Sequence, residues 1–510
     1  MSLASPKALQ VNSKVLARNT VFNFGGQTMV ALVAVILVPL VVQALGHESY
    51  GLLSLVLTVF GSFNLLELGL GRTATKFVAE YLGRGELDRL GSVIWTSFGL
   101  QVFTGVLEGA LLAMAAPFLA SRVFNVPVQL VEETQRMLFI LAFSAPVVLA
   151  SSALRGALEG AQRFDLVNAI KVALNVSTYL VPLIAAQINI GITGIVFLLL
   201  IARLIATIAY LLCCIWTFPS IRTHLSFDVL SIPFLFSYAG WIALSNLIVP
   251  FLVQLDRYLI ASLVSVEAVT FYSVPFEILN GLWIIPSVVA TVLFPAFSSL
   301  HAQDNKNLAD LYMRAIKYIF ATLGSIVLIM ITFSHELLLY WQGPSFAERS
   351  TLVLQILLAG AFVNSLAYMP LNLLLGLGFP DLPAKLNLLE LPIYLLSAYF
   401  LISKHGIVGA SVAFTIRAAL DAALLFISVW SLVPSTLQTA TYNNLRFALA
   451  LLLLFGLGLW SIRSLPIGLV IQGVLTNALL ILYTGLVLYK VLDNTDRRIL
   501  FTLLRSESAP

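Results

Sequence analysis

The chain has 510 residues, of which 60% are hydrophobic and only 10% are charged. Globular domains carry charge on about a quarter of their residues, so this composition excludes an ordinary soluble protein. The formal net charge of +4 is spread over short segments between long apolar runs. That distribution indicates membrane topology and contact with anionic lipids, and it argues against nucleic-acid binding. We therefore predict a polytopic membrane protein.

Fourteen apolar stretches follow one another along the chain, separated by short loops. A hydrocarbon core about 30 Å thick needs roughly 20 apolar residues for each helical crossing. Backbone in lipid must satisfy its own hydrogen bonds, and the runs have no alternating period, so the prediction is all-α. The predicted spans cover residues 20–45, 50–70, 92–118, 136–154, 172–187, 191–216, 231–254, 269–297, 315–334, 351–375, 385–403, 406–432, 444–461 and 466–489.

Lysine and arginine are distributed unevenly between the two sets of loops. The N-terminus and the loops on its side hold 20 of the 28 basic residues, whereas the opposite loops hold 6. Because basic loops stay in the cytoplasm, both termini are predicted to be cytoplasmic. The first apolar run is too long for a signal peptide and is interpreted as a retained helix. The two remaining basic residues, Arg203 and Arg417, fall inside predicted spans.

A repeat relates the two halves of the chain. Residues 162–166, leading to 190–194, have a counterpart in residues 378–382, leading to 405–409. The offset contains an even number of predicted helices, so both halves have the same orientation. We predict a six-helix lobe over residues 1–217 and a second over 218–433, related by an axis along the membrane normal with a cavity between them. Residues 434–510 add two helices and a cytoplasmic tail.

The sequence offers little for catalysis. No glycine precedes a lysine, which excludes the phosphate-binding P-loop, and no G-x-S-x-G elbow occurs. Cys213 and Cys214 are adjacent, which gives neither a disulfide framework nor a metal-spaced pair. We predict a protein that is not an enzyme and that has no cofactor or metal site.

Several short motifs occur in an order that resembles the polysaccharide transporter family, the Wzx-type oligosaccharide flippases of the MOP superfamily, whose relatives include MATE and MurJ-like proteins. The resemblance extends over nearly the whole chain and rests on residues 19–46, 45–51, 66–71, 158–164 and 255–259. Two positions depart from the family pattern. Thr270-Phe271-Tyr272 stands where Gly-x-Tyr is expected, and Glu67 stands where aspartate is frequent.

The resemblance implies translocation of a polyprenyl-diphosphate-linked oligosaccharide from the cytoplasmic to the outer leaflet, by alternating access, for cell-surface polysaccharide synthesis. It also implies the inner membrane of a prokaryote, and as partners membrane lipids, other polysaccharide-assembly proteins and H⁺ or Na⁺ as a coupling ion. The alternatives are a MATE-like cation or drug antiporter, a peptidoglycan-precursor (lipid II) flippase and, less in keeping with the short outer loops, a glycan polymerase or ligase.

Charges inside the predicted spans are the candidate headgroup contacts. Arg203 and Arg417 lie about 18 Å along their helices, near mid-membrane, where charged residues usually face an interior or a water-filled cavity. A guanidinium suits a diphosphate because it offers bidentate donors. Internal pairing is the alternative, since Asp421 follows Arg417 at i+4 and Glu108 is expected at the depth of Arg203.

Four further residues complete the predicted site. Glu277 lies between Pro275 and Asn280-Gly281 in a helix loosened by these breakers, and it is a candidate for binding a coupling proton or sodium ion. A structural carboxylate is the alternative there. Glu67, Arg72 and Lys76 lie at the cytoplasmic mouth, where they would meet a diphosphate or act only as topology charges.

Overall fold

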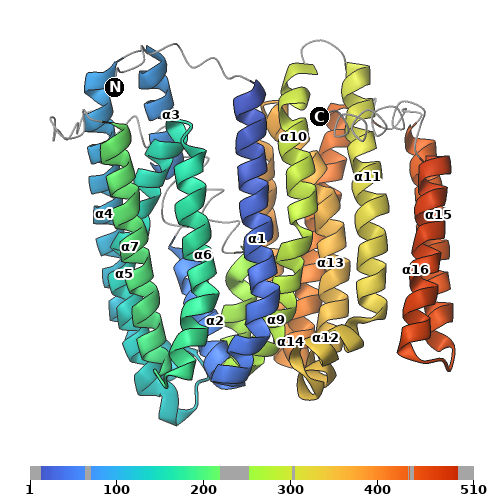
Figure 1. Cartoon of the computed structure of the whole chain (residues 1–510), viewed down its shortest axis with the longest axis horizontal. Helices are drawn as coiled ribbons and strands as arrows, with labels where there is room; N and C mark the ends of the chain where they lie inside the picture. The colour runs from blue at the N-terminus through green and yellow to red at the C-terminus, as the bar shows by residue number, and fades with distance from the viewer. Residues whose placement is uncertain are drawn as a thin grey trace, which may run out of the picture. The chain divides into compact units, whose positions relative to one another are not determined.

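The computed structural model describes residues 13–63, 70–84, 86–218, 252–300, 305–434, 436 and 441–491. Regular structure in this part of the chain is helical (Figure 1). Eleven of these helices are long and apolar enough to cross a membrane. The prediction of an all-α polytopic membrane protein is confirmed.

The chain divides into two compact units. The first comprises Met1–Gly281 with Asn387–Ala413, and the second comprises Leu282–Leu386 with Phe414–Pro510. The lobes over residues 1–217 and 218–433 stay a prediction. The helices of the first unit are α1 (Ser13–Leu45), α2 (His47–Ser62), α3 (Leu70–Arg84), α4 (Leu87–Phe118), η1 (Leu119–Val123), η2 (Val128–Leu130), α5 (Val131–Gly160), α6 (Phe164–Gln187), α7 (Ile192–Thr217), a helix over residues 252–263, and α9 (Val266–Leu282).

The second unit is built from the later helices. They are α10 (Ile284–Leu300), α11 (Asn305–Thr332), α12 (Ser334–Gln342), α13 (Pro344–Gly376), α15 (Thr441–Ser464), α16 (Leu469–Leu486) and η6 (Val487–Val491). α14 (Asp381–Leu432) contributes its middle to the first unit and its two ends to the second.

Two predicted spans differ from the observed helices. The span 269–297 is divided between α9 and α10, with Trp283 between them. The spans 385–403 and 406–432 both lie in α14, and the backbone leaves helical geometry at Gly406 (φ 56, ψ −134), so two helical segments meet there as predicted. The span 50–70 includes most of α2, and α3 begins at its last residue, Leu70, and continues to Arg84. Most of the span 231–254 lies outside the described residues. Helix α12 also occupies a segment for which the sequence predicts an outer loop.

Close packing of α4 on α5 depends on two glycines one turn apart. A Cβ on Gly105 would lie 2.5 Å from Pro146 Cα, and one on Gly109 would lie 2.3 Å from the Ala142 carbonyl oxygen. Two small residues spaced by four let helix backbones approach within a bilayer, where hydrophobic burial does not drive helix association. This pair therefore fixes the two helices against each other within the first unit (Figure 1).

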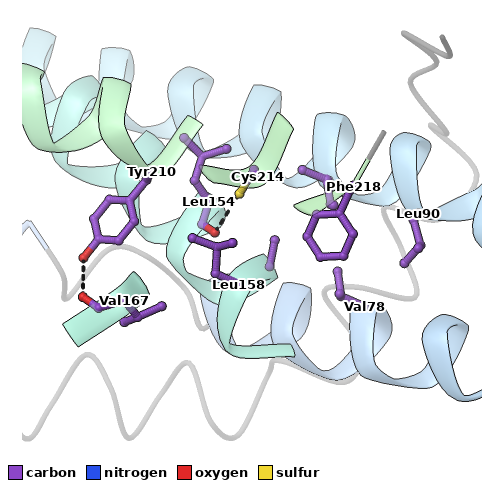
Figure 2. Packing of buried hydrophobic residues seen from close by; sticks show 10 residues of the cluster. Val78, Leu90, Leu154, Leu158, Val167, Tyr210, Cys214 and Phe218 are labelled. Carbon is purple, nitrogen blue, oxygen red and sulfur yellow. Dashed lines mark hydrogen bonds between the residues drawn. The ribbon is translucent and has the colours of Figure 1, made fainter. Parts of the chain in front are cut away.

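An apolar cluster joins α3, α4, α5, α6 and α7 at one end of the first unit (Figure 2). Two hydrogen bonds cross it. Tyr210 donates from its hydroxyl to the Val167 carbonyl at 3.5 Å, and the Cys214 thiol donates to the Leu154 carbonyl at 3.3 Å. Both donors lie on one face of α7, which is thereby held against α5 and α6.

The two halves of the predicted repeat share a helix-ending turn. Gln162 and Gly378, which are 216 residues apart, both have positive φ (58° and 84°). The next amide donates to a carbonyl five residues earlier in each copy: Arg163 to Leu158 at 2.9 Å and Phe379 to Leu374 at 3.0 Å. This is the hydrogen-bond pattern of a Schellman helix end. The sequence repeat therefore corresponds to repeated local structure.

In the second unit, α15 and α16 pack on α11. Leu452, Phe455, Leu459 and Tyr483 form a buried cluster, and the Tyr483 hydroxyl donates to the Ala321 carbonyl at 2.9 Å. Lys317 is fully buried on α11 and donates to the Val491 carbonyl at 3.2 Å, at the end of η6. A buried ammonium group is costly unless it is hydrogen-bonded, and this carbonyl accepts from it. The two C-terminal helices are thus integrated in the second unit.

Candidate functional site

A polar cavity of about 300 Å³ lies within the first unit. Polar side chains gather on it although the surrounding helices are largely apolar. A buried polar surface in a membrane protein is costly unless a ligand or water uses it, so the cavity is the leading candidate for a binding site. Its lining comprises Val41, Tyr50, Leu53, Ser54, Leu57, Thr58, Thr178, Tyr179, Val253, Gln254, Arg257, Ser273, Phe276, Glu277 and Asn280.

Two helices present regular polar stripes to the cavity. On α2, Tyr50, Ser54 and Thr58 recur every four residues, and on α9 the stripe includes Ser273, Glu277 and Asn280. Positions three or four apart share one face of a helix, so each stripe forms a continuous wall. The α2 wall carries only hydroxyl groups, whereas the α9 wall carries a carboxylate. The cavity is lined by residues from both predicted lobes.

Arg257 is the cation of this cavity. It lies on the helix over residues 252–263, one turn after Gln254, and is only 9% exposed. Its Nε donates to Ser273 Oγ at 3.3 Å, and its guanidinium carbon lies 4.6 Å from the centre of the Phe276 ring. A hydrogen bond and a cation–π contact, both to α9, therefore hold the side chain at the wall.

Asp256 precedes Arg257 but faces a different environment. It is fully buried, does not line the cavity, and accepts a hydrogen bond from the Tyr272 hydroxyl at 2.6 Å and another from the Tyr394 hydroxyl. Successive residues on a helix point about 100° apart, which explains the separation. The carboxylate ties the 252–263 helix to α9 and to the middle of α14.

Glu277 lies in the cavity, as a coupling residue requires. Its carboxylate accepts from the Asn280 amide at 3.1 Å and from the Tyr179 hydroxyl at 3.4 Å. The second contact joins α6 to α9. These partners fit the structural alternative as well, and the role in ion coupling stays a prediction.

Arg203 does not line the cavity. It is half-buried on α7, with its guanidinium carbon 4.0 Å from the centre of the buried Phe60 ring. In the described part of the chain no salt bridge joins Arg203 to Glu108. Glu108 has one buried carboxylate oxygen, Oε2, without a hydrogen-bond partner among these residues. Substrate contact by either residue stays a prediction.

Arg417 belongs to the second unit. It is 8% exposed, and its guanidinium carbon lies 5.7 Å from the centre of the Phe414 ring. Asp421 follows one turn later and is half-buried. Two of the predicted mouth residues, Arg72 and Lys76, lie on α3. The third, Glu67, lies outside the described residues. All of these assignments stay predictions.

Sequence reasoning missed Arg257 because it ended the seventh span at residue 254. That boundary placed Arg257 among the charges of an outer loop, whereas the helix continues to residue 263. The motif Leu255-Asp256-Arg257-Tyr258-Leu259 already contained the signal, since two opposite charges lie between apolar residues next to a predicted span. Extending the span through that motif would have added Arg257 to the intramembrane cations.

Comparisons with known proteins agree with this architecture. A family described as "Polysaccharide biosynthesis protein" matches residues 16–301, more than half of the chain. The chain belongs to this family. A Shigella flexneri protein named as an O-antigen transporter is 27% identical over 417 residues, which cover 80% of this chain and 96% of that relative. The Bacillus subtilis membrane protein EpsK is 23% identical over 360 residues, covering 68% of this chain and 70% of its own.

Solved structures identify the fold. The lipid II flippase MurJ in an inward closed conformation aligns with a TM-score of 0.71 at 12% identity, covering 93% of this chain and 98% of that one. An inward-facing multidrug resistance MATE transporter of the MOP superfamily gives 0.69 at 16% identity, covering 81% and 96%. The predicted MOP fold is confirmed, as is the family resemblance.

Proposed function

We propose that this protein translocates a polyprenyl-diphosphate-linked oligosaccharide from the cytoplasmic to the outer leaflet for cell-surface polysaccharide synthesis. The observation that carries the proposal is the cavity of about 300 Å³, in which hydroxyl, amide, guanidinium and carboxylate groups line one space within a membrane domain. Membership of the polysaccharide biosynthesis family and similarity to a protein named as an O-antigen transporter support the choice of cargo.

The physical problem of flipping explains why such a cavity is useful. An unpaired hydroxyl in an alkane-like medium costs roughly 4–8 kcal/mol, and an ionised group costs far more. A polar cavity replaces water around the sugars and phosphates while the prenyl chain stays in lipid. Rocking of two lobes around the cavity would expose it to each side in turn without opening a pore.

Location and partners follow from the same proposal. Basic residues are concentrated on the loops that share a side with the N-terminus. We therefore place both termini in the cytoplasm and the protein in the inner membrane of a prokaryote. Lipid-linked oligosaccharide, membrane lipids and other polysaccharide-assembly proteins are the proposed partners. The protein moves its cargo and does not alter it chemically.

Glu277 is the proposed coupling residue. A carboxylate in the same cavity opposes an incoming diphosphate, and a proton or sodium ion bound to Glu277 would remove that repulsion. Its contact with Tyr179 joins α6 to α9, so a change at the carboxylate also affects how these helices are held. Arg203, Arg417, Glu108 and Asp421, with the mouth residues Glu67, Arg72 and Lys76, stay candidate headgroup contacts along the path.

The test is reconstitution into liposomes that contain a fluorescent polyprenyl-diphosphate oligosaccharide in one leaflet. We expect the headgroup to become accessible in the opposite leaflet faster with protein than in protein-free vesicles. Lipid II and a cationic dye are assayed in parallel vesicles. Acceleration of lipid II alone would favour a peptidoglycan-precursor flippase, and cation-driven efflux of the dye alone would favour a MATE-like antiporter.

A further inference from the structure

Arg257 has unused hydrogen-bonding capacity on the cavity wall. A guanidinium has five N–H donors in a rigid fork. Nε–H donates to Ser273, and the face of the group lies on Phe276. Arg257 forms no other side-chain hydrogen bond or ion pair in the described part of the chain. The donors on the terminal nitrogens therefore remain for a ligand.

Among the described residues, neither Asp256 nor Glu277 forms a salt bridge with this cation. Asp256 is turned into the protein, where Tyr272 and Tyr394 donate to it. Glu277 accepts from Tyr179 and Asn280 and, among the described residues, forms no salt bridge with Arg257. A buried guanidinium without a carboxylate partner is costly, and that cost is recovered when an anion binds.

We propose that Arg257 is the residue that binds the diphosphate of the lipid-linked cargo. This proposal rests on the proposed function and names its principal anion contact. Two parallel N–H donors match two phosphate oxygens, and such charge-assisted pairs are roughly twice as strong as neutral hydrogen bonds. Ser273 and Phe276 are positioning residues, because they fix the plane of the guanidinium. The hydroxyl wall of Tyr50, Ser54 and Thr58 then lies in the same cavity for the first sugar.

The test measures binding of polyprenyl diphosphate without sugar, and of polyprenyl monophosphate, to purified protein in nanodiscs. Arg257→Ala should weaken diphosphate binding by roughly tenfold to hundredfold. Arg257→Lys should weaken diphosphate binding less than Arg257→Ala does. It should also reduce the preference for diphosphate over monophosphate, because a lysine cannot donate two parallel hydrogen bonds as a guanidinium does. Arg136→Ala is the matched control, since Arg136 pairs with Glu132 at the surface at 2.5 Å. Thermal unfolding checks that each variant is folded.

Two outcomes are distinguished. Folded Arg257→Ala protein that binds diphosphate as tightly as the unchanged protein overturns the role of Arg257, even where glycan flipping is established. Unchanged protein that neither binds polyprenyl diphosphate nor flips any lipid-linked glycan contradicts the proposed function itself. Where Arg257→Ala does not fold, Ser273→Ala provides the test, because it keeps the charge of Arg257 and removes the hydrogen bond that orients its guanidinium. Ser273→Ala must then lower the preference for diphosphate.

A separate contact joins α2 to α9 within the first unit. α2 and α9 meet so closely that a Cβ on Gly51 would lie 2.1 Å from the Val266 carbonyl oxygen. The Thr270 hydroxyl donates to the His47 carbonyl at 2.6 Å, and the rings of His47 and Phe271 lie 4.9 Å apart. Gly51 follows Tyr50, which lines the cavity. The contact therefore lies directly beside the cavity.

Asn125 adds two hydrogen bonds near the same contact. Its backbone amide donates to the Ala261 carbonyl at 2.8 Å, and its side-chain amide donates to the Val264 carbonyl at 2.8 Å. These carbonyls end the helix over residues 252–263, where helical partners are missing. The predicted topology places His47 and Asn125 on the outer side. We infer that the α2–α9 contact and Asn125 form the outer gate, which closes the cavity to the outside. The helices of this gate must separate before the cargo is released.

The gate is tested by cysteine labelling in sealed vesicles of known orientation. The background carries Cys213→Ala and Cys214→Ser, and Ser54→Cys places a reporter thiol on the cavity wall. With Gly51 intact, an impermeant thiol reagent outside should not label the reporter. Gly51→Ala should make it reactive from outside, because the added Cβ cannot be accommodated against Val266. Gly281→Ala is the control, since a Cβ on Gly281 would meet no other group within 4 Å.

Equal protection of the reporter in folded Gly51→Ala and Gly51 proteins would overturn the gate. Where Gly51→Ala does not fold, Thr270→Val removes the hydrogen bond to His47 with little change of shape, and it should raise labelling from outside. The readout does not depend on transport, so its result is independent of the cargo.

Discussion

The cavity wall and the inner face of α7 lie in the same unit, and each carries one intramembrane arginine. On α7, Arg203 stacks on Phe60, and the same face continues through Thr207, Tyr210 and Cys214, which donate to carbonyls of neighbouring helices. On the cavity wall, Arg257 is held by α9 but retains donors directed to no protein group among those described. The contacts described for the α7 face are all to protein groups, whereas we propose that the cavity wall binds a ligand. Depth in the membrane identifies a costly charge, but its neighbours decide what the charge does.

The largest effect on folding is expected at Asp256, next to Arg257. Asp256→Ala would leave the buried hydroxyls of Tyr272 and Tyr394 without their acceptor, at about 1–3 kcal/mol for each group. We expect a marked fall in the thermal unfolding temperature, with a smaller fall for Asp256→Asn. Thermal unfolding in nanodiscs measures both. Unchanged stability in Asp256→Ala would contradict the division between a packing carboxylate and a ligand-binding guanidinium.

Glu277 should control how flipping responds to pH and sodium. A proton or sodium ion bound at Glu277 removes the negative charge that opposes a diphosphate, so flipping by the unchanged protein should depend on pH or sodium. The other ionisable groups at this site are Tyr50, Tyr179 and Arg257. Glu277→Gln should flip at a rate that no longer varies with pH or sodium. If Glu277→Gln shows the same pH profile as the unchanged protein, Glu277 has a structural role and does not couple flipping to an ion.

The smallest effect is expected in the packed cluster of Figure 2. Tyr210→Phe removes a single long hydrogen bond to Val167 and leaves the ring in place (Figure 2). We expect a loss of stability of about 1 kcal/mol or less and an unchanged flipping rate. Loss of transport in a fully folded Tyr210→Phe protein would mean that the α7 face contributes to the cargo path.

The sequence was most informative where one physical rule dominates. Apolar run length predicted most helices, and the segments matched by the sequence repeat have a shared turn at Gln162 and Gly378. Helix boundaries near charges were less predictable, because a charge between two spans is interpreted as part of a loop unless its partners are known. Arg257 shows this: its burial depends on Ser273 and Phe276, which approach only after folding. Likewise, the stacking of Arg203 on Phe60 depends on the packing of α2 against α7, which residue spacing does not specify.

The most direct measurement compares Arg257→Ala and Arg203→Ala in the liposome flipping assay with polyprenyl-diphosphate oligosaccharide. We expect Arg257→Ala to reduce protein-dependent flipping by about a hundredfold or more. Arg203→Ala loses a cation–π contact worth roughly 0.5–2 kcal/mol and should reduce flipping by less than about tenfold. Equal rates for Arg257→Ala and the unchanged protein, with both proteins folded, would contradict the assignment of the cavity as the headgroup site.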